Sequence, residues 1–196
     1  GTAPGALTYS PVSGTVLAPG THTLTATAAS TSNYNQATKT VSIIVTTNNQ
    51  TITFAALSNK SYGDAAFTLT ATATSGLPVS FSVSGPATLS SNTLTITGAG
   101  EVSVTASQAG NGDYDEAVAA VRTFTVSKAN QVITWATPAA IASGTALGAT
   151  QLNASVQGVS GGTATGALTY SPVSGTVLAP GTHTLTATAA STSNNN

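Results

Sequence analysis

The amino-acid sequence predicts an all-β protein, and three observations support this fold class. Apolar residues alternate with Thr and Ser in segment after segment, which is the period-2 pattern of a strand with one buried face. Clusters of Gly, Pro, Ser and Asn separate these segments at short intervals, as expected for turns between strands. No segment shows the 3.6-residue periodicity of an amphipathic helix.

The alternation is clearest after Phe67, where Phe67, Leu69 and Ala71 share one face and threonines occupy the other. Thr suits the solvent face of a sheet because its branched Cβ favours extended backbone. Between 49 and 129 we expect strands near 51–55, 67–73, 79–84, 87–90, 92–97, 101–107 and 121–127. Seven short strands in about 80 residues are typical of an immunoglobulin-like β-sandwich.

Internal repeats define the domain organisation. Residues 1–35 recur at 162–196 with 33 of 35 positions identical, and residues 49–55 resemble 130–136 at an offset of 81. The chain therefore alternates two related kinds of repeat. We assign 1–48 to the C-terminal part of a type-A repeat, 49–129 to a complete type-B repeat, and 130–196 to the N-terminal part of the next type-A repeat.

Both ends of the sequence fall inside a repeat, so we expect the chain to be a window on a longer repetitive polymer. The alternative is strand complementation between chains, in which the incomplete ends complete one another by adding a strand to an open sheet. The joins near 46–48 and 127–129 are short and are not flexible Gly/Ser linkers. Successive sandwiches are therefore expected to form a stiff, extended rod.

The composition excludes several functional classes. The chain has 38 Thr and 23 Ser, is 5% charged, and has a formal net charge of −1. This charge gives no basis for nucleic-acid binding, and no apolar run is long enough for membrane insertion. Without cysteine there is no disulfide, thiolate metal site or cysteine nucleophile. No Ser, His and Asp fall into a catalytic pattern, so we expect no enzymatic activity.

The sole carboxylate cluster is the candidate metal site, and it consists of Asn111, Asp113, Asp115 and Glu116. Calcium prefers several oxygen ligands, which these side chains could supply. The type-A repeat has the amides Asn33, Asn35 and Gln36 in place of the three acidic residues. The competing interpretation is that these side chains cap a turn by bonding nearby backbone. No other cofactor is indicated.

Two pairs of residues recur at matching places in the repeats. Tyr34 and Tyr114 each stand just before the last strand of a repeat, where we interpret them as structural residues at the sandwich end. His22 and His183 occupy the same position in the repeated sequence. Neither has another His, Cys or carboxylate at the spacing of a metal site. We interpret both histidines as structural.

Several stretches resemble tandem bacterial immunoglobulin-like repeats of the MBG ("mostly beta") type. They are 128–135 (KANQVITW), 170–178 (YSPVSGTVL) and the Ala109-Gly110-Asn111 segment that leads to Tyr114. The resemblance covers essentially the whole chain, and it implies an extracellular or cell-surface location without catalytic residues. The acidic residues at 113, 115 and 116 depart from the amides or Ala expected there.

Together these features lead us to expect a structural extracellular repeat protein that forms a rod, stalk or filament at a bacterial surface. Its partners would be copies of itself along or between filaments. One alternative is an adhesin module that binds glycan or a host protein through loops at the sandwich ends, using Tyr9, Tyr62 or Tyr170. A further alternative is an ice-binding surface made by the Thr rows.

Overall fold

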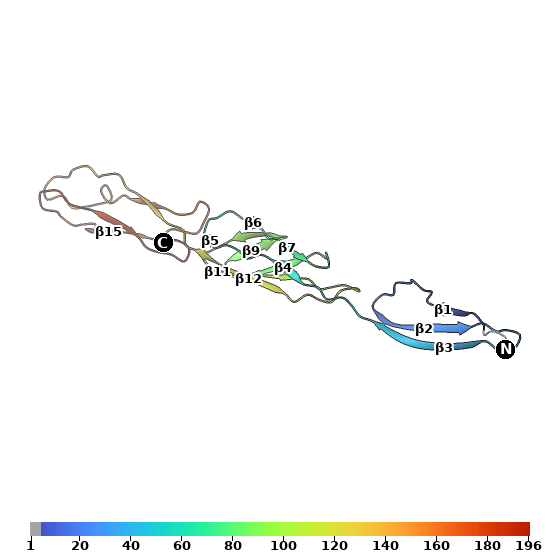
Figure 1. Ribbon diagram of the computed structural model, residues 1–196. Helices are drawn as coiled ribbons and strands as arrows, with labels where there is room; N and C mark the ends of the chain where they lie inside the picture. Colours follow the sequence, from blue (N-terminus) through green and yellow to red (C-terminus); the bar gives the residue numbers. More distant parts are fainter. Residues whose placement is uncertain (1–4) are drawn as a thin grey trace. The chain divides into compact units, whose positions relative to one another are not determined.

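The computed structural model describes residues 5–196, and every regular element in that part of the chain is a β-strand. Figure 1 shows the strands as short arrows joined by loops. The predicted all-β fold class is confirmed. Across residues 5–196 there is no helix that could cross a membrane.

The chain divides into two compact units. Unit 1 comprises the chain up to Thr53 together with Thr72–Val79 and Ser107–Ala119. Unit 2 comprises Phe54–Ala71, Ser80–Ala106 and Ala120–Asn196. The two units are described separately below.

Unit 1 contains a three-stranded antiparallel sheet with the order β1-β2-β3. Its strands are β1 (Leu7–Ser10), β2 (Gly20–Ala28) and β3 (Ala37–Val45). Strands β2 and β3 pair along all nine residues, with Gly20 opposite Val45 and Ala28 opposite Ala37. The sheet leaves large apolar side chains uncovered, including Tyr9 at 59% exposure and Val41 at 55%.

Unit 2 contains two sheets formed largely by residues 60–127. One has the order β5-β12-β11-β8 and the other β6-β10-β9. The strands are β5 (Lys60–Ser61), β6 (Phe67–Thr68), β8 (Ser80–Ser84), β9 (Ala87–Ser90), β10 (Thr93–Ile96), β11 (Gly100–Ser107) and β12 (Ala120–Ser127). β10 pairs antiparallel with β6 and with β9, β11 pairs antiparallel with β12, and β5 and β12 run parallel.

The apolar faces of these two sheets form the core of unit 2. Leu94 on β10 and Val102 and Val104 on β11 are 0% exposed. Phe67 of one sheet meets Phe124 of the other, with ring centroids 6.0 Å apart in an edge-on arrangement. Edge-on contacts of this kind add to the free energy already gained by burying the rings. The alternation of buried apolar and exposed Thr side chains along β10 matches the predicted pattern.

The strand predicted at 67–73 is divided in two in the structure. β6 (Phe67–Thr68) pairs with β10, whereas β7 (Ala71–Ala73) pairs with β4 (Ile52–Phe54). The backbone N–H of Leu69 still donates to the carbonyl of Asn92 at 2.8 Å. The segment therefore changes sheets between Leu69 and Ala71, although its apolar side chains keep their alternation throughout.

The remaining residues of unit 2 form two isolated strand pairs. β13 (Val132–Thr134) pairs with β14 (Ser155–Gln157), and β15 (Leu168–Ser171) pairs with β16 (Thr186–Ala189). Both pairs are antiparallel. β15 has the same four residues as β1, and it pairs in the same register with the equivalent strand.

Substitution of one buried and one exposed valine tests the core of unit 2. Val102→Ala removes two methyl groups from a side chain that is 0% exposed, so the free energy of unfolding should fall by about 2–3 kcal/mol. Val173→Ala, at 65% exposure, should change it by no more than about 0.5 kcal/mol. Urea denaturation followed by circular dichroism measures both. Equal effects of the two substitutions would contradict this core assignment.

Candidate functional site

A short backbone pairing occurs at each of the two predicted joins, near residues 48 and 129, and we call each pairing a junction. The first junction lies within unit 1 and pairs Asn48 with the turn Asp113–Asp115. The N–H of Asn48 donates to the carbonyl of Asp113 at 2.8 Å, and the N–H of Asp115 donates to the carbonyl of Asn48 at 2.9 Å. The two bonds form a parallel bridge between Asn48 and Tyr114. This pairing fixes the segment that leads into β4.

The second junction has the same form within unit 2. The N–H of Ala129 donates to the carbonyl of Asn194 at 2.9 Å, and the N–H of Asn196 donates back to Ala129 at 2.8 Å. The bridge joins Ala129 to Asn195. Each residue lies 81 positions after its equivalent in the first junction. Backbone groups make the bonds, so the junction persists although its side chains differ.

A glutamine supports each junction. Gln50 is 6% exposed, and its amide nitrogen lies 2.6 Å from both the carbonyl of Asp115 and the side-chain oxygen of Gln108. Gln131 takes the equivalent position and donates to the carbonyl of Asn196 at 2.9 Å. Buried amides bonded in this way stabilise a fixed geometry. The recurrence of Asn-Gln at an offset of 81 was the sequence signal for these residues, but it did not reveal their contacts.

A side-chain oxygen closes the turn in both junctions and also closes a third turn, which begins at Thr31. The Oδ1 of Asn111 accepts hydrogen bonds from the N–H groups of Asp113 at 2.8 Å and Tyr114 at 2.9 Å. The hydroxyls of Thr31 and Thr192 accept from the amides two and three residues later, at 3.0–3.4 Å. The same turn therefore occurs three times, with Asn or Thr as the capping residue.

The candidate calcium ligands lie on or next to this turn. Asn111 caps the turn, and Asp115 accepts a hydrogen bond from the hydroxyl of Thr47 at 2.5 Å. The side chains of Asp113 and Glu116 are exposed. In the part of the chain that the structure describes, no three His, Cys, Asp or Glu residues are grouped so that they could hold a metal ion. Calcium binding remains a prediction that is tested below.

Tyr34 and Tyr114 occupy matching positions in two of the turns. Tyr34 is 55% exposed, whereas Tyr114 is half-buried. Their backbone carbonyls accept the N–H groups of Thr31 and Asn111, both at 2.9 Å. Asn195 takes this place in the third turn with a bond of 2.8 Å. The backbone at this position closes the turn whichever side chain it carries.

Tyr62 and Asn194 make side-chain contacts near the second junction. Tyr62 is 8% exposed, and its hydroxyl accepts the N–H of Thr163 at 2.8 Å. The side-chain oxygen of Asn194 accepts the N–H of Ala99, also at 2.8 Å. Both bonds connect residues of the 49–129 part with residues that follow position 130. Tyr62 is therefore buried rather than available to an external ligand.

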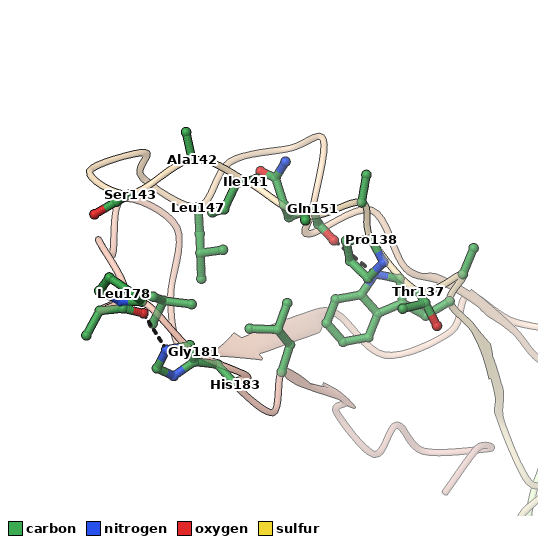
Figure 2. A pocket seen from close by; sticks show the side chains of 17 residues that line it. Thr137, Pro138, Ile141, Ala142, Ser143, Leu147, Gln151, Leu178, Gly181 and His183 are labelled. Carbon is green, nitrogen blue, oxygen red and sulfur yellow. Dashed lines mark hydrogen bonds between the residues drawn. The ribbon is translucent and has the colours of Figure 1, made fainter.

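A groove in unit 2 is lined by both apolar and polar side chains, and we call it the Trp135 groove (Figure 2). Its volume is about 580 Å³. Residues 135–143, Leu147 and Gln151 line one side, and residues 178–181, His183 and Leu185 line the other. Figure 2 shows Leu147 pointing from its loop toward the segment that carries Leu178 and His183.

Trp135 lines the Trp135 groove and makes two contacts within unit 2. Its indole N–H donates to the carbonyl of Gln151 at 3.0 Å, and its ring lies edge-on to Tyr170 at 5.4 Å. Tyr170, an adhesin candidate in the sequence, thus packs against the only tryptophan of the chain. Sequence reasoning did not identify this groove, because its walls come from segments about 45 residues apart.

The two histidines make the same local contact. The Nε2 atom of His22 lies 2.6 Å from the carbonyl of Ala18, and that of His183 lies 2.7 Å from the carbonyl of Ala179. The ring N–H donates in each bond. Both histidines hold the bend that leads into the following Thr-rich segment.

Comparison of the sequence with protein-family models and with curated proteins found no match.

The turn cap is tested by two substitutions at one position. Asn111→Ala removes the acceptor of two backbone N–H groups, and the free energy of unfolding should fall by about 1 kcal/mol. Asn111→Thr should retain most of the free energy of unfolding, because the hydroxyls of Thr31 and Thr192 cap the equivalent turns. Thermal denaturation measures both variants.

Thermal denaturation with and without calcium distinguishes a turn cap at Asn111 from a calcium site at the same residues. The melting temperature should stay the same on addition of calcium or of a chelator. A calcium-dependent rise that disappears in the Asp113→Asn, Asp115→Asn variant would establish the metal site instead.

Proposed function

We propose that this protein is a structural repeat protein of a bacterial surface, in which immunoglobulin-like β-sandwiches follow one another in a stiff rod, stalk or filament. The observation that carries the proposal is the recurrence of one backbone junction, at Asn48 and again at Ala129. The same bond pattern at two positions 81 residues apart gives the two proposed boundaries between repeats the same backbone pairing. A shaft built from nearest-neighbour contacts requires that regularity.

The chemistry of the junctions supports stiffness rather than flexible tethering. Each junction is closed by two backbone bonds and a glutamine side chain. At the second junction, the ammonium group of Lys128 also donates to the hydroxyl of Ser191 at 2.9 Å. A connection bonded at several points has few accessible orientations, unlike a Gly/Ser linker.

The surface chemistry supports contact between copies. The chain is only 5% charged, and the exposed positions of strands such as β10 carry Thr. Weakly charged, hydroxyl-rich faces can pack side by side with little electrostatic repulsion. The resemblance to MBG repeats agrees with an extracellular setting. Copies of the same chain are accordingly the proposed partners.

The Trp135 groove favours a second candidate function, an adhesin module. A volume of about 580 Å³ falls within the range that binds small ligands, and Trp135 offers an aromatic surface. A glycan array in which a specific hit disappears in Trp135→Ala would support this function over a purely mechanical one.

Pulsed electron paramagnetic resonance tests the stiffness of each junction. The chain has no cysteine, so labels can be placed at single introduced positions. Labels at Thr23→Cys and Thr123→Cys report on the first junction, and labels at Thr88→Cys and Thr188→Cys report on the second. We expect a narrow distance distribution for each pair.

Glutamine substitutions provide the matched comparison. Gln50→Ala should broaden only the first distribution, and Gln131→Ala only the second. Gln36→Ala and Gln157→Ala, both at exposed positions, should broaden neither. Broad distributions at both junctions of the unsubstituted chain would refute the stiff shaft.

A further inference from the structure

A tight turn of four residues, Ser61 to Asp64, lies beside the last residue of β12 in unit 2, and we call it the Tyr62 turn. The N–H of Asp64 donates to the carbonyl of Ser61 at 3.0 Å, and Gly63 has a φ of +96°. The N–H of Tyr62 donates to the carbonyl of Ser127 at 2.9 Å. The Tyr62 turn is therefore fixed to the strand that leads directly into the second junction.

The loop 158–167, which joins β14 to β15, contacts the Tyr62 turn within unit 2. The hydroxyl of Tyr62 accepts the N–H of Thr163 at 2.8 Å. A Cβ atom placed on Gly63 would come within 2.8 Å of both γ-carbons of Val159. Packing this close leaves no room for a side chain at Gly63, so the turn and the loop fit each other.

Asn194, in the turn of the second junction, adds another contact between the same parts of unit 2. Its side-chain oxygen accepts the N–H of Ala99 at 2.8 Å, and its side-chain nitrogen donates to the hydroxyl of Thr163 at 3.2 Å. A Cβ atom placed on Gly98 would lie 2.9 Å from that side-chain oxygen. One asparagine thus joins the turn before β11 to the loop that contacts Tyr62.

The type-A repeat has the same turn without the tyrosine. The N–H of Thr145 donates to the carbonyl of Ala142 at 3.1 Å, and Gly144 has a φ of +84°. Ser143 occupies the position of Tyr62, 81 residues later. The oxygen of serine is bonded to its Cβ, whereas that of tyrosine lies beyond the ring. Ser143 therefore cannot reach as far as the hydroxyl of Tyr62 does.

The turn before β11 also differs between the two kinds of repeat. Ala179 and Pro180 occupy the positions of Gly98 and Ala99, 81 residues later. Proline has no backbone N–H to donate to an asparagine. The Cβ of alanine would crowd the oxygen that Asn194 directs to this place. Neither residue of the type-A repeat can therefore make the contact that its type-B equivalent makes.

The loop that contacts Tyr62 is particular to the type-A repeat. Ten residues, 158–167, join β14 to β15, whereas six residues, 74–79, join the equivalent strands β7 and β8. Asp113 occupies the position of Asn194, 81 residues earlier, and an ionised carboxylate accepts hydrogen bonds but donates none. A type-B repeat in the following position would therefore lack both the longer loop and the donor that supports it.

We propose that the Tyr62 turn, together with Gly98 and Ala99, is a docking surface by which a type-B repeat binds the repeat that follows it, and that this surface selects a type-A repeat. A B–A boundary then has a side-chain contact in addition to its backbone junction, and an A–B boundary has the junction without this contact. The inference names a second kind of joint in the shaft proposed above and rests on that function only for its biological role.

Two glycine substitutions in the full chain test the docking. Gly63→Ala and Gly144→Ala both introduce a methyl group at a left-handed φ, so both introduce similar backbone strain. Only Gly63→Ala also places the methyl group against Val159, because no described atom lies within 4 Å of a Cβ at Gly144. With spin labels at Thr88→Cys and Thr188→Cys, Gly63→Ala should broaden the distance distribution, and Gly144→Ala should leave it unchanged.

A substitution in the loop provides the rescue. Val159→Ala removes the two γ-carbons that the new methyl group would meet. Combined with Gly63→Ala, it should restore the narrow distribution, and this double-mutant cycle isolates the contact between the two positions. Equal broadening by Gly63→Ala and Gly144→Ala, or no rescue by Val159→Ala, would refute the docking.

Hydrogen exchange measured by nuclear magnetic resonance needs no spin label. Thr163 is exposed, and its N–H is bonded to the hydroxyl of Tyr62. Tyr62→Phe removes that oxygen alone, so the N–H of Thr163 should exchange faster. The N–H of Thr145, which is bonded within its own turn, should exchange at the same rate in both proteins. An unchanged rate at Thr163 would contradict the contact.

Exchange of residues between the repeat types tests the selectivity. Tyr62→Ser and Ala99→Pro together give the type-B surface the residues of the type-A repeat, and they should broaden the second distance distribution. A distribution that stays narrow would overturn the selection of type A. The result is distinguishable from failure of the shaft. Broad distributions at both junctions of the unsubstituted chain refute the shaft, whereas narrow distributions that Gly63→Ala leaves unchanged remove only the docking.

Discussion

The backbone pairing at Asn48, which recurs at Ala129, is the constraint on which the local structure of each unit depends. It joins positions 65 residues apart, such as Asn48, which precedes β4, and Asp113, which precedes β12. Closing so long a loop costs conformational entropy, which the buried core between the two positions must offset. In return, the segment before β4 and the turn before β12 are held together.

The sequence GTHTLTATA occurs twice, so the two copies show which features of a strand are local and which depend on tertiary contacts. Residues 20–28 and 181–189 are identical, yet the first is a strand throughout and the second only in its last four residues. The histidine contact at the start of each copy is the same, so local conformation is preserved. The difference arises from the neighbouring strand β3, whose backbone groups pair with the whole of β2.

Much of the fold could be predicted from alternation alone. Residues 93–96 form a strand with Leu94 and Ile96 buried and the threonines exposed, as the pattern indicates. The division of 67–73 could not be predicted, because the side chains alternate correctly across it while the hydrogen-bonding partners change. At the candidate site, the turn-capping role of Asn111 was among the interpretations, whereas the burial of Gln50 and Tyr62 depends on segments distant in sequence.

The sequence by itself determined the all-β class, the alternation of apolar and Thr side chains, and the repeat offsets of 81 and 161. Those properties follow from local periodicity and composition, which no tertiary contact alters. Only the tertiary structure decided which backbone groups pair at the junctions, which tyrosine is buried, and where the segment 67–73 passes from one sheet to another. These depend on residues brought together by folding, and two identical segments can therefore differ in their pairing.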